Sequence, residues 1–160
     1  MERYLLDSNV FITSENHIPR DIFGSFWDRL GDSLESGVAV LHRVVLDELK
    51  RRRDPLVEWI EGLESLRVMS ATNETLERYL EVCDWADKQG YIPAALREFK
   101  AESRADAWLC AEALNSHLTI VTYEVSSNSR NKVKIPNVCD GLGIRYISGF
   151  DFMRTQGFRF

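Results

Sequence analysis

The sequence predicts an α/β fold in which a central, mostly parallel sheet of about four or five strands is flanked by helices on both faces. Short apolar runs rich in branched residues recur along the chain, and segments of helical periodicity separate them. Strands that alternate with helices in this way connect in parallel, with the helices packed on the two faces of the sheet.

The bulk composition is that of one soluble domain over residues 1–160. The 160 residues are 44% hydrophobic and 28% charged, no run approaches the roughly 20 apolar residues of a membrane span, and no signal peptide precedes the first apolar run. We therefore expect a cytoplasmic protein with no membrane partner. Cys83, Cys110 and Cys139 lack a CxxC spacing, which argues against a disulfide framework and a zinc site. The net charge of −5 gives no general attraction for nucleic acid, so RNA would need local basic patches or metal ions.

The first buried strand is predicted at Tyr4 to Leu6, and Asp7 follows it directly. In open α/β sheets, ligands bind at the edge where strands end, so Asp7 is a candidate site residue. An aspartate at this position can also cap a following helix or turn the chain. An amphipathic helix from Asp21 to Leu34, with Ile22 and Phe23 among its apolar residues, and a second buried strand over residues 37–41 come next.

Residues 43–53 predict a helix that places Glu48 at the edge of its inward face. A carboxylate there needs a hydrogen-bonding or metal partner, because a bare buried charge is costly. Alternatively, Glu48 reaches solvent or pairs with Arg52 one turn later.

The middle of the chain predicts further helices over residues 56–63, 73–88 and 93–100, with a short extended piece at 66–69. Thr72 or Asn73 can cap the longest of these helices. Its expected inward residues are Leu76, Tyr79, Leu80, Cys83 and Trp85 or Ala86.

Asp106 lies in the first turn of a helix predicted from about Ser103 to Leu114. Leu109, Cys110 and Ala113 follow it at the spacing of one helical face, so its carboxylate is aligned with the apolar stripe. A capping box with Ser103 is the alternative, because acids are favoured in a first helical turn.

A clear buried strand at residues 118–122 ends in Thr122-Tyr123-Glu124, so another acid follows a strand end. A polar loop over residues 125–134, a last strand at 144–147 and a short helix from Gly149 complete the predicted order. If the strands are neighbours, four carboxylates meet at one edge and repel one another unless a cation joins them. Oxygen ligands without His or Cys favour Mg²⁺ or Mn²⁺.

In order and spacing, these motifs resemble a PIN domain, in particular the toxin nucleases of bacterial type II toxin-antitoxin systems. The resemblance rests on Asp7 with Asn9 two residues on, Glu48 in a Val-Leu-Asp-Glu-Leu helix, Asp106 in Arg-Ala-Asp-Ala, and Thr122-Tyr123-Glu124. It covers nearly the whole chain. Glu124 stands where Asp is usual in that family, and a long tail follows it over residues 125–140, which indicates an outlying branch.

The resemblance implies a single PIN-like domain with Mg²⁺- or Mn²⁺-dependent endoribonuclease activity, a homodimer, and an antitoxin protein that blocks the site. It makes Asp7, Glu48 and Asp106 metal ligands, Glu124 the fourth acid, and Asn9 and Thr122 supporting residues. Candidate phosphate contacts are the basic residues Arg51, Arg52, Arg130, Lys132 and Lys134, with Lys50 and Arg53 in the same basic run. Such a run at a helix end is also compatible with a solvated terminus.

Two other functions remain open from the sequence. A PIN-like module without catalysis could bind RNA or a protein, which the net acidity also fits. A haloacid-dehalogenase-like phosphatase would use Asp7 as a nucleophile, but that chemistry normally wants a second Asp where this chain has Asn9.

Overall fold

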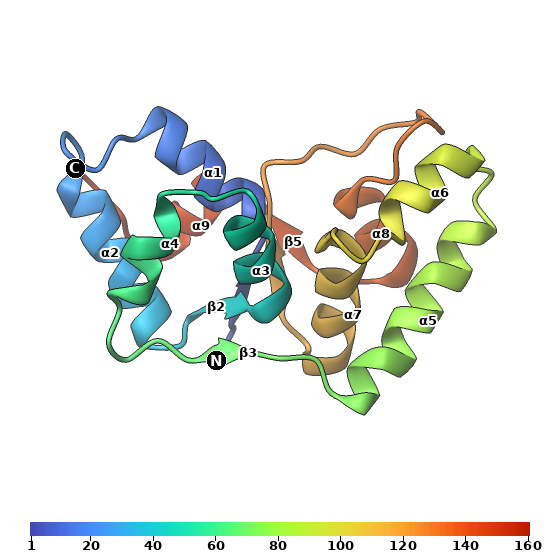
Figure 1. Ribbon diagram of the computed structural model, residues 1–160, viewed down its shortest axis with the longest axis horizontal. Coiled ribbons are helices and arrows are strands. Elements are labelled where there is room, and N and C mark those ends of the chain that lie inside the picture. The colour runs from blue at the N-terminus through green and yellow to red at the C-terminus, as the bar shows by residue number, and fades with distance from the viewer.

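A five-stranded sheet forms the centre of the computed structural model, which describes residues 1–160 (Figure 1). The strands are β1 (Tyr4–Leu6), β2 (Ala39–His42), β3 (Val68–Met69), β4 (Thr119–Val121) and β5 (Tyr146–Ile147). Their order across the sheet is β3-β2-β1-β4-β5, and every neighbouring pair is parallel. The α/β fold predicted from the sequence is confirmed.

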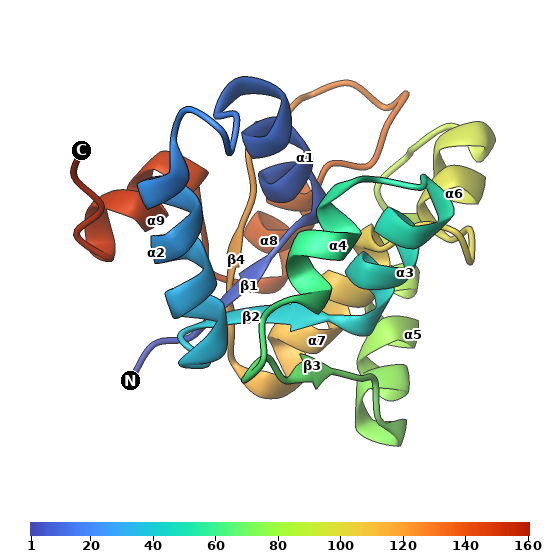
Figure 2. The same cartoon turned by 60° about the vertical axis from the view of Figure 1, so that its left-hand side comes forward.

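Helices cover both faces of the sheet (Figure 2). They are α1 (Ser8–His17), α2 (Gly24–Glu35), α3 (Arg43–Arg51), α4 (Leu56–Glu61), α5 (Asn73–Asp87), α6 (Pro93–Phe99), α7 (Asp106–Ser116), α8 (Ile135–Leu142) and α9 (Gly149–Thr155). Helices α2 and α9 lie on one face, joined by a 3.0 Å hydrogen bond from Arg29 to the carbonyl of Gln156, whereas α5, α7 and α8 lie on the other. None of these helices is long and apolar enough to cross a membrane.

One hydrophobic core holds the layers together, and 37 buried apolar residues belong to it. Leu5, Leu41 and Ile120 are fully buried in the central strands, because helices cover the sheet on both sides. Phe11 and Phe152 fill the space beneath α1 and α9. Each such side chain stabilises the fold by about 1.5–3 kcal/mol. The core therefore fixes the strand ends, and with them the groups that leave the sheet.

Two helices have no counterpart in the sequence prediction. Helix α1 begins directly after Asp7, whose side chain makes no capping hydrogen bond although it occupies the N-cap position. Helix α8 begins inside the tail that follows the polar loop, with Pro136 in its first turn. Proline is favoured there because its missing N–H is not needed at a helix start.

The prediction for the inward face of α5 is wrong at two positions. Leu76 and Leu80 are 46% and 61% exposed, whereas Thr75, Val82 and Ala86 are buried. Helix α5 packs against α7, and the Thr75 hydroxyl donates a hydrogen bond to Glu112 of that helix. A polar contact with a neighbouring helix thus selects a face that apolar periodicity alone does not indicate.

The helix predicted from Asp21 begins later, at Gly24. Ile22 and Phe23 precede it and are 68% and 45% exposed, so the prediction that they face the sheet is wrong. The backbone N–H groups of Ile22 and Phe23 both donate hydrogen bonds to the carbonyl of Pro19, and these bonds hold the two residues in a turn.

Candidate functional site

Asp7 lies at the carboxyl end of the central strand β1 and is only 2% exposed. Thr122 Oγ1 donates a 2.8 Å hydrogen bond to Asp7 Oδ2, and Ser8 Oγ lies 3.4 Å from Asp7 Oδ1. The backbone N–H of Asp7 donates to the carbonyl of Val121, which continues the ladder between β1 and β4. The sheet thus fixes the position of this carboxylate, and two hydroxyls fix its orientation.

Glu48 reaches the same edge from α3 and is half-buried. Ser8 Oγ donates to its Oε1 at 2.8 Å, and the backbone N–H of Ala105 donates to its Oε2 at 3.1 Å. Glu48 therefore points inward, as predicted. Its hydrogen-bond partners are Ser8 of α1 and the backbone before α7, and it does not pair with Arg52. Ser8 links Asp7 and Glu48 directly.

Asp106 is the first residue of α7 and is 6% exposed. The predicted alignment of its carboxylate with the apolar face is confirmed, because Leu109, Cys110 and Ala113 are buried. Ser103 does not cap the helix: the N-cap residue is Ala105, which makes no side-chain cap. The Asp106 carboxylate instead lies 3.5 Å from Nη2 of Arg104.

Thr122 joins three parts of the site through its hydroxyl. Besides donating to Asp7, Thr122 Oγ1 accepts hydrogen bonds from the Asn9 side-chain amide at 3.3 Å and from the Glu124 backbone N–H at 3.1 Å. Asn9 Oδ1 in turn accepts from the backbone N–H of Tyr123 at 3.2 Å. Asn9 and Thr122 therefore support the acids from α1 and from the end of β4, the positions predicted for them.

Glu124 follows β4 and is half-buried. The backbone N–H of Ile135, the first residue of α8, donates to Glu124 Oε2 at 2.9 Å. This contact closes the polar loop between β4 and α8 and keeps the side chain near the strand end. The charge of Glu124 raises the pKa of both Asp7 and Asp106, which places it within electrostatic reach of the two buried acids.

The buried acids hold their protons unusually strongly. Burial raises the pKa of Asp7 to about 8, and the charges of Asp106, Glu124 and Glu48 add to the effect, although the Thr122 hydrogen bond opposes it. Burial also raises the pKa of Asp106 to about 6, with contributions from Glu124 and Glu48 and opposition from Arg104. Both pKa shifts have the same two causes: burial away from water, and the negative charge of the neighbouring carboxylates.

The donor set fits a hard divalent cation by charge and by atom type. Asp7, Glu48, Asp106 and Glu124 offer only carboxylate oxygens, the ligands that Mg²⁺ and Mn²⁺ prefer. A complete ligand shell is not formed by the side chains as they stand, since no three His, Cys, Asp or Glu side chains are arranged to hold a metal ion. Glu48 and Glu124 each give one oxygen to a backbone N–H. Asp7 and Asp106, the two buried carboxylates of the four, are the residues that would hold a cation.

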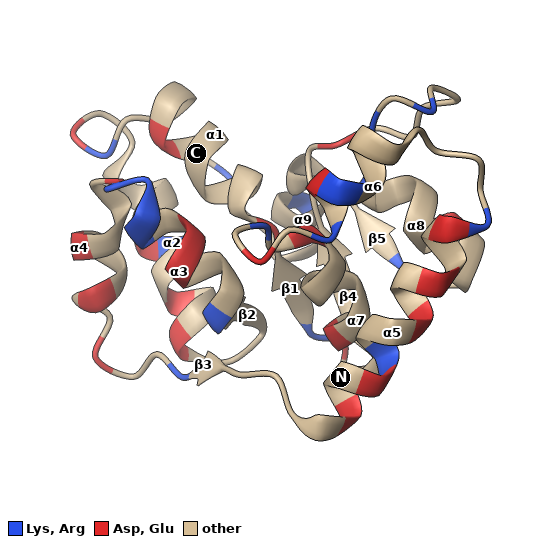
Figure 3. Ribbon diagram, turned by 45° about the vertical axis from the view of Figure 1, so that its right-hand side comes forward, with Lys and Arg blue, Asp and Glu red and all other residues tan.

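The basic residues predicted to contact phosphate fall into two groups. Lys132, on the loop between β4 and α8, lines a small cavity together with Asp106 and lowers the pKa of that acid, so it lies beside the site. Figure 3 shows how the Lys and Arg residues are distributed over the fold. Arg51 donates a 2.8 Å hydrogen bond to the carbonyl of Ser103, so its guanidinium group lies beside the segment that precedes Asp106. Both residues can meet a phosphate that approaches the acids.

The other three residues predicted to contact phosphate, Arg52, Arg130 and Lys134, make no hydrogen bond or ion pair with the four acids. Arg130 stacks over the ring of Tyr91, 5.4 Å from its centroid, and its carbonyl accepts a hydrogen bond from the N–H of Ile92. Arg52 is exposed at the end of α3, and Lys134 is half-buried at the N-cap of α8.

Ser8 and Arg104 are site residues that were not predicted from the sequence. Ser8 immediately follows Asp7, and Arg104 precedes Asp106 by two residues, so nearness in the sequence was a usable signal in both cases. Arg104 bridges Asp106 and Glu98, at 3.5 Å and 3.2 Å respectively. Of the four acids, only Asp106 forms an ion pair, and its partner is Arg104.

A family model described as "Domain of unknown function (DUF4411)" matches residues 4–160. The chain belongs to this family. The DUF4411 match begins with β1 and therefore includes all four acids and every element that positions them. The description of the DUF4411 family names no activity, substrate or partner. A comparison with curated proteins found no match.

Proposed function

We propose that this protein is a Mg²⁺- or Mn²⁺-dependent endoribonuclease that hydrolyses RNA phosphodiester bonds at the acidic site. The main support is the convergence of Asp7, Glu48, Asp106 and Glu124 from four separate elements onto the carboxyl edge of one sheet. Ser8 and Thr122 orient these acids through hydrogen bonds of 2.8 Å. A site with no catalytic or binding role would gain stability by replacing such clustered acids, because the charges of Glu48 and Glu124 raise the pKa of both buried aspartates.

The chain's own residues would divide the work of hydrolysis. A bound divalent cation would supply a water of lowered pKa and neutralise charge on the phosphodiester. Asp7 and Asp106 would hold that cation, with Glu48 and Glu124 completing its surroundings. Lys132 and Arg104, which lie beside Asp106, would attract the phosphate, while Thr122 and Asn9 keep the carboxylate of Asp7 in place.

The resemblance to PIN-domain toxins extends the proposal to partners and location. It adds a homodimer, an antitoxin protein that covers the acids, and a cytoplasmic setting in which RNA is the substrate. The net charge of −5 requires that RNA approach through a local basic surface, which Arg51, Arg104 and Lys132 can form around Asp106.

Cleavage of a fluorescently labelled RNA in Mg²⁺ or Mn²⁺ tests the proposal, with EDTA as the metal-free control. Asp106→Asn should abolish cleavage, whereas Asp32→Asn, the same chemical change at an exposed position of α2, should leave it intact. Both variants should unfold cooperatively. Full activity of Asp106→Asn, or cleavage that persists in EDTA, would refute the proposal.

A second candidate function is a PIN-like module that binds RNA or a protein without catalysis. It is favoured by the hydrogen bonds that backbone N–H groups already make to Glu48 and Glu124, since these reduce the oxygens free for a metal. RNA binding that needs no divalent ion, with no cleavage in any of them, would favour this module over the nuclease.

A further inference from the structure

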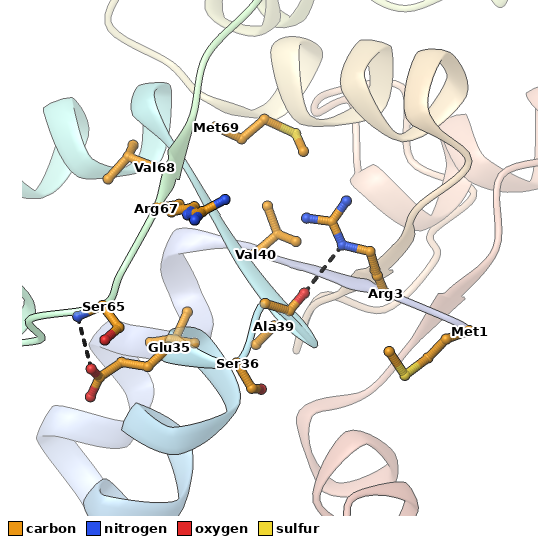
Figure 4. A pocket seen from close by; sticks show the side chains of 12 residues that line it. Met1, Arg3, Glu35, Ser36, Ala39, Val40, Ser65, Arg67, Val68 and Met69 are labelled. Carbon is orange, nitrogen blue, oxygen red and sulfur yellow. Dashed lines mark hydrogen bonds between the residues drawn. The ribbon is translucent and has the colours of Figure 1, made fainter.

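A cavity of about 600 Å³ opens at the end of the sheet opposite to the acidic site (Figure 4). Arg3 directly precedes β1, and Arg67 directly precedes β3, so both lie where the parallel strands begin. Asp7 lies where β1 ends. The volume of the cavity is in the range of small-molecule sites in proteins. It is thus separate from the four acids and needs its own explanation.

Two guanidinium groups face this cavity without a carboxylate partner. Arg3 Nε donates a 3.2 Å hydrogen bond to the carbonyl of Gly37, and Arg67 makes no side-chain hydrogen bond. Neither arginine belongs to any of the ion pairs of the molecule. Gly37, whose carbonyl accepts this bond, adopts a φ of 82°, a conformation that favours glycine. In a protein of net charge −5, two free guanidiniums beside one cavity form a local anion-attracting site.

The floor between the two arginines is apolar. Leu41 pairs with Val68 in the parallel register of β2 and β3, which places Val40 next to Arg67 on the same face of the sheet. Figure 4 shows the two guanidinium groups on either side of Val40, with Met69 beyond them. Val40 is buried, whereas Met69 is only partly covered by protein. A ligand could therefore place an apolar body on Val40 and Met69 while its charge meets the arginines.

The one carboxylate that lines the cavity does not neutralise them. Glu35 Oε2 accepts a 2.9 Å hydrogen bond from the backbone N–H of Ser65. In Figure 4 the Glu35 carboxylate points toward Ser65 and away from Arg3 and Arg67. Its hydrogen bond holds it there, so the centre of the cavity keeps its positive charge.

We propose that this cavity binds an organic anion, in which a carboxylate, sulfonate or phosphate group is attached to an apolar body. The anionic group would accept hydrogen bonds from Arg3 and Arg67, since a guanidinium offers a planar set of donors that matches such groups. The apolar body would cover Val40 and Met69, which line the cavity. This binding is independent of the acidic site and of the proposed nuclease.

Two fluorescent probes of nearly equal shape test the proposal. Anilinonaphthalene sulfonate carries an anionic group, and phenylnaphthylamine has the same apolar body without it. Titration of the native protein in EDTA should show that the anionic probe binds at least about tenfold more tightly, the difference expected for one charge-assisted hydrogen bond. Equal affinity for the two probes, or no binding of the anionic probe, would overturn the proposal.

Substitution of the two arginines tests whether the anionic probe binds in this cavity. Arg3→Ala and Arg67→Ala should each weaken the anionic probe roughly tenfold and leave phenylnaphthylamine unchanged. Arg97→Ala is the matched control, because Arg97 is an exposed arginine on α6 outside the cavity, and it should change neither affinity. Unchanged thermal unfolding would show that the variants are folded. Retained affinity for the sulfonate in Arg3→Ala and Arg67→Ala would contradict the assignment.

Discussion

Thr122 and Asp7 are 115 positions apart in the sequence, and the Thr122 hydroxyl donates a 2.8 Å hydrogen bond to the Asp7 carboxylate. The same hydroxyl accepts from Asn9 and from the backbone of Glu124. One oxygen atom thus ties the end of β1, the start of α1 and the end of β4 into a single polar cluster. Its removal disturbs the geometry of the acids without removing any of them.

Thr122→Val should therefore lower RNA cleavage by about 10–100-fold, the usual effect of losing a group that orients metal ligands. Thr122→Ser, which keeps the hydroxyl, should retain most of the activity. Thr119→Val, at the other end of the same strand, removes a hydroxyl that bonds to Glu2 and should not change cleavage. Equal rates for Thr122→Val and the native protein would show that this hydroxyl does not position the site.

Addition of millimolar Mg²⁺ or Mn²⁺ should raise the unfolding temperature of the native protein. An ion at about 100 times its dissociation constant stabilises a fold by about 2.7 kcal/mol, which corresponds to several degrees in a domain of this size. Asp7→Asn should remove the shift, while Asp32→Asn, on the exposed face of α2, should keep it. A shift of the same size in Asp7→Asn would place the metal elsewhere.

In EDTA, the stability of the native protein should fall as the pH rises toward 9. The pKa of Asp7 is raised to about 8 in the folded state from an ordinary value of 3.8, so the folded state holds this proton more strongly than the unfolded state. The resulting stability is fully present below pH 3.8 and is lost as the pH rises through about 8. Asp7→Asn should show a flatter profile in urea denaturation between pH 6 and 9. Parallel profiles would contradict the raised pKa.

A second buried cluster should matter for stability rather than for cleavage. Glu112 of α7 accepts hydrogen bonds from Thr75 and Ser116, and its Oε1 lies 3.0 Å from His42 Nε2. The backbone N–H of Val44 donates to His42 Nδ1, which leaves the ring proton on Nε2 to bond Glu112. Glu112→Ala leaves these donors unpaired and should cost at least about 2 kcal/mol by urea denaturation.

The control for this cluster is Glu77→Ala, an exposed acid of α5, which should change stability little. Burial raises the pKa of Glu112, but the hydrogen bonds from His42 and Ser116 outweigh burial and hold that pKa below its usual 4.5. Its contribution to stability is therefore present above pH 4.5 and is lost as the pH falls through the lowered folded-state pKa. Native-like stability of Glu112→Ala would show that solvent replaces the lost bonds.

Gly149→Ala should destabilise the fold by about 1–3 kcal/mol, the usual cost of overpacking. A Cβ atom at this position would lie only 2.3 Å from the ring of Tyr123. Gly24→Ala is the matched comparison, because Gly24 is also a first helical residue and a Cβ atom there has no neighbour within 4 Å. Thermal unfolding of the two variants measures the difference, and equal midpoints would mean that Tyr123 moves aside without cost.

The centre of the sheet was predictable because β1, β2 and β4 are buried on both faces. Tyr4–Leu6 and Thr119–Val121 appear in the sequence as short runs of apolar and β-branched residues, and covering helices remove the alternation of polar and apolar residues that a half-exposed strand would show. Helix α1 was not predictable in the same way, since Asn, Ser and β-branched residues weaken its helical pattern. The exposure of Leu76 and Leu80 depends on the packing of α5 against α7, which sequence periodicity does not contain.

The candidate site was predictable at the acids and, from the family resemblance, at Asn9 and Thr122, but not at Ser8, Arg104 or the Ala105 backbone. Asp7 and Glu124 follow strand ends, and Asp106 is aligned with an apolar face, so position alone singles them out. The hydrogen bonds of Glu48 to Ser8 and to the Ala105 backbone join residues 40 and 57 positions apart. Such bonds depend on how α1, α3 and α7 meet above the sheet.

The central position of β1 makes assembly of the acidic site depend on the synthesis of β4, which lies far along the chain from β1. Strand β1 lies between β2 and β4, and its second neighbour, Thr119–Val121, is synthesised much later than β1 itself. Until β4 has left the ribosome, one edge of β1 stays unpaired, Asp7 lacks its bond to Thr122, and Asp106 has no sheet on which to settle. The four acids therefore come together only after the segment from Thr119 to Glu124 has been synthesised and has paired with β1.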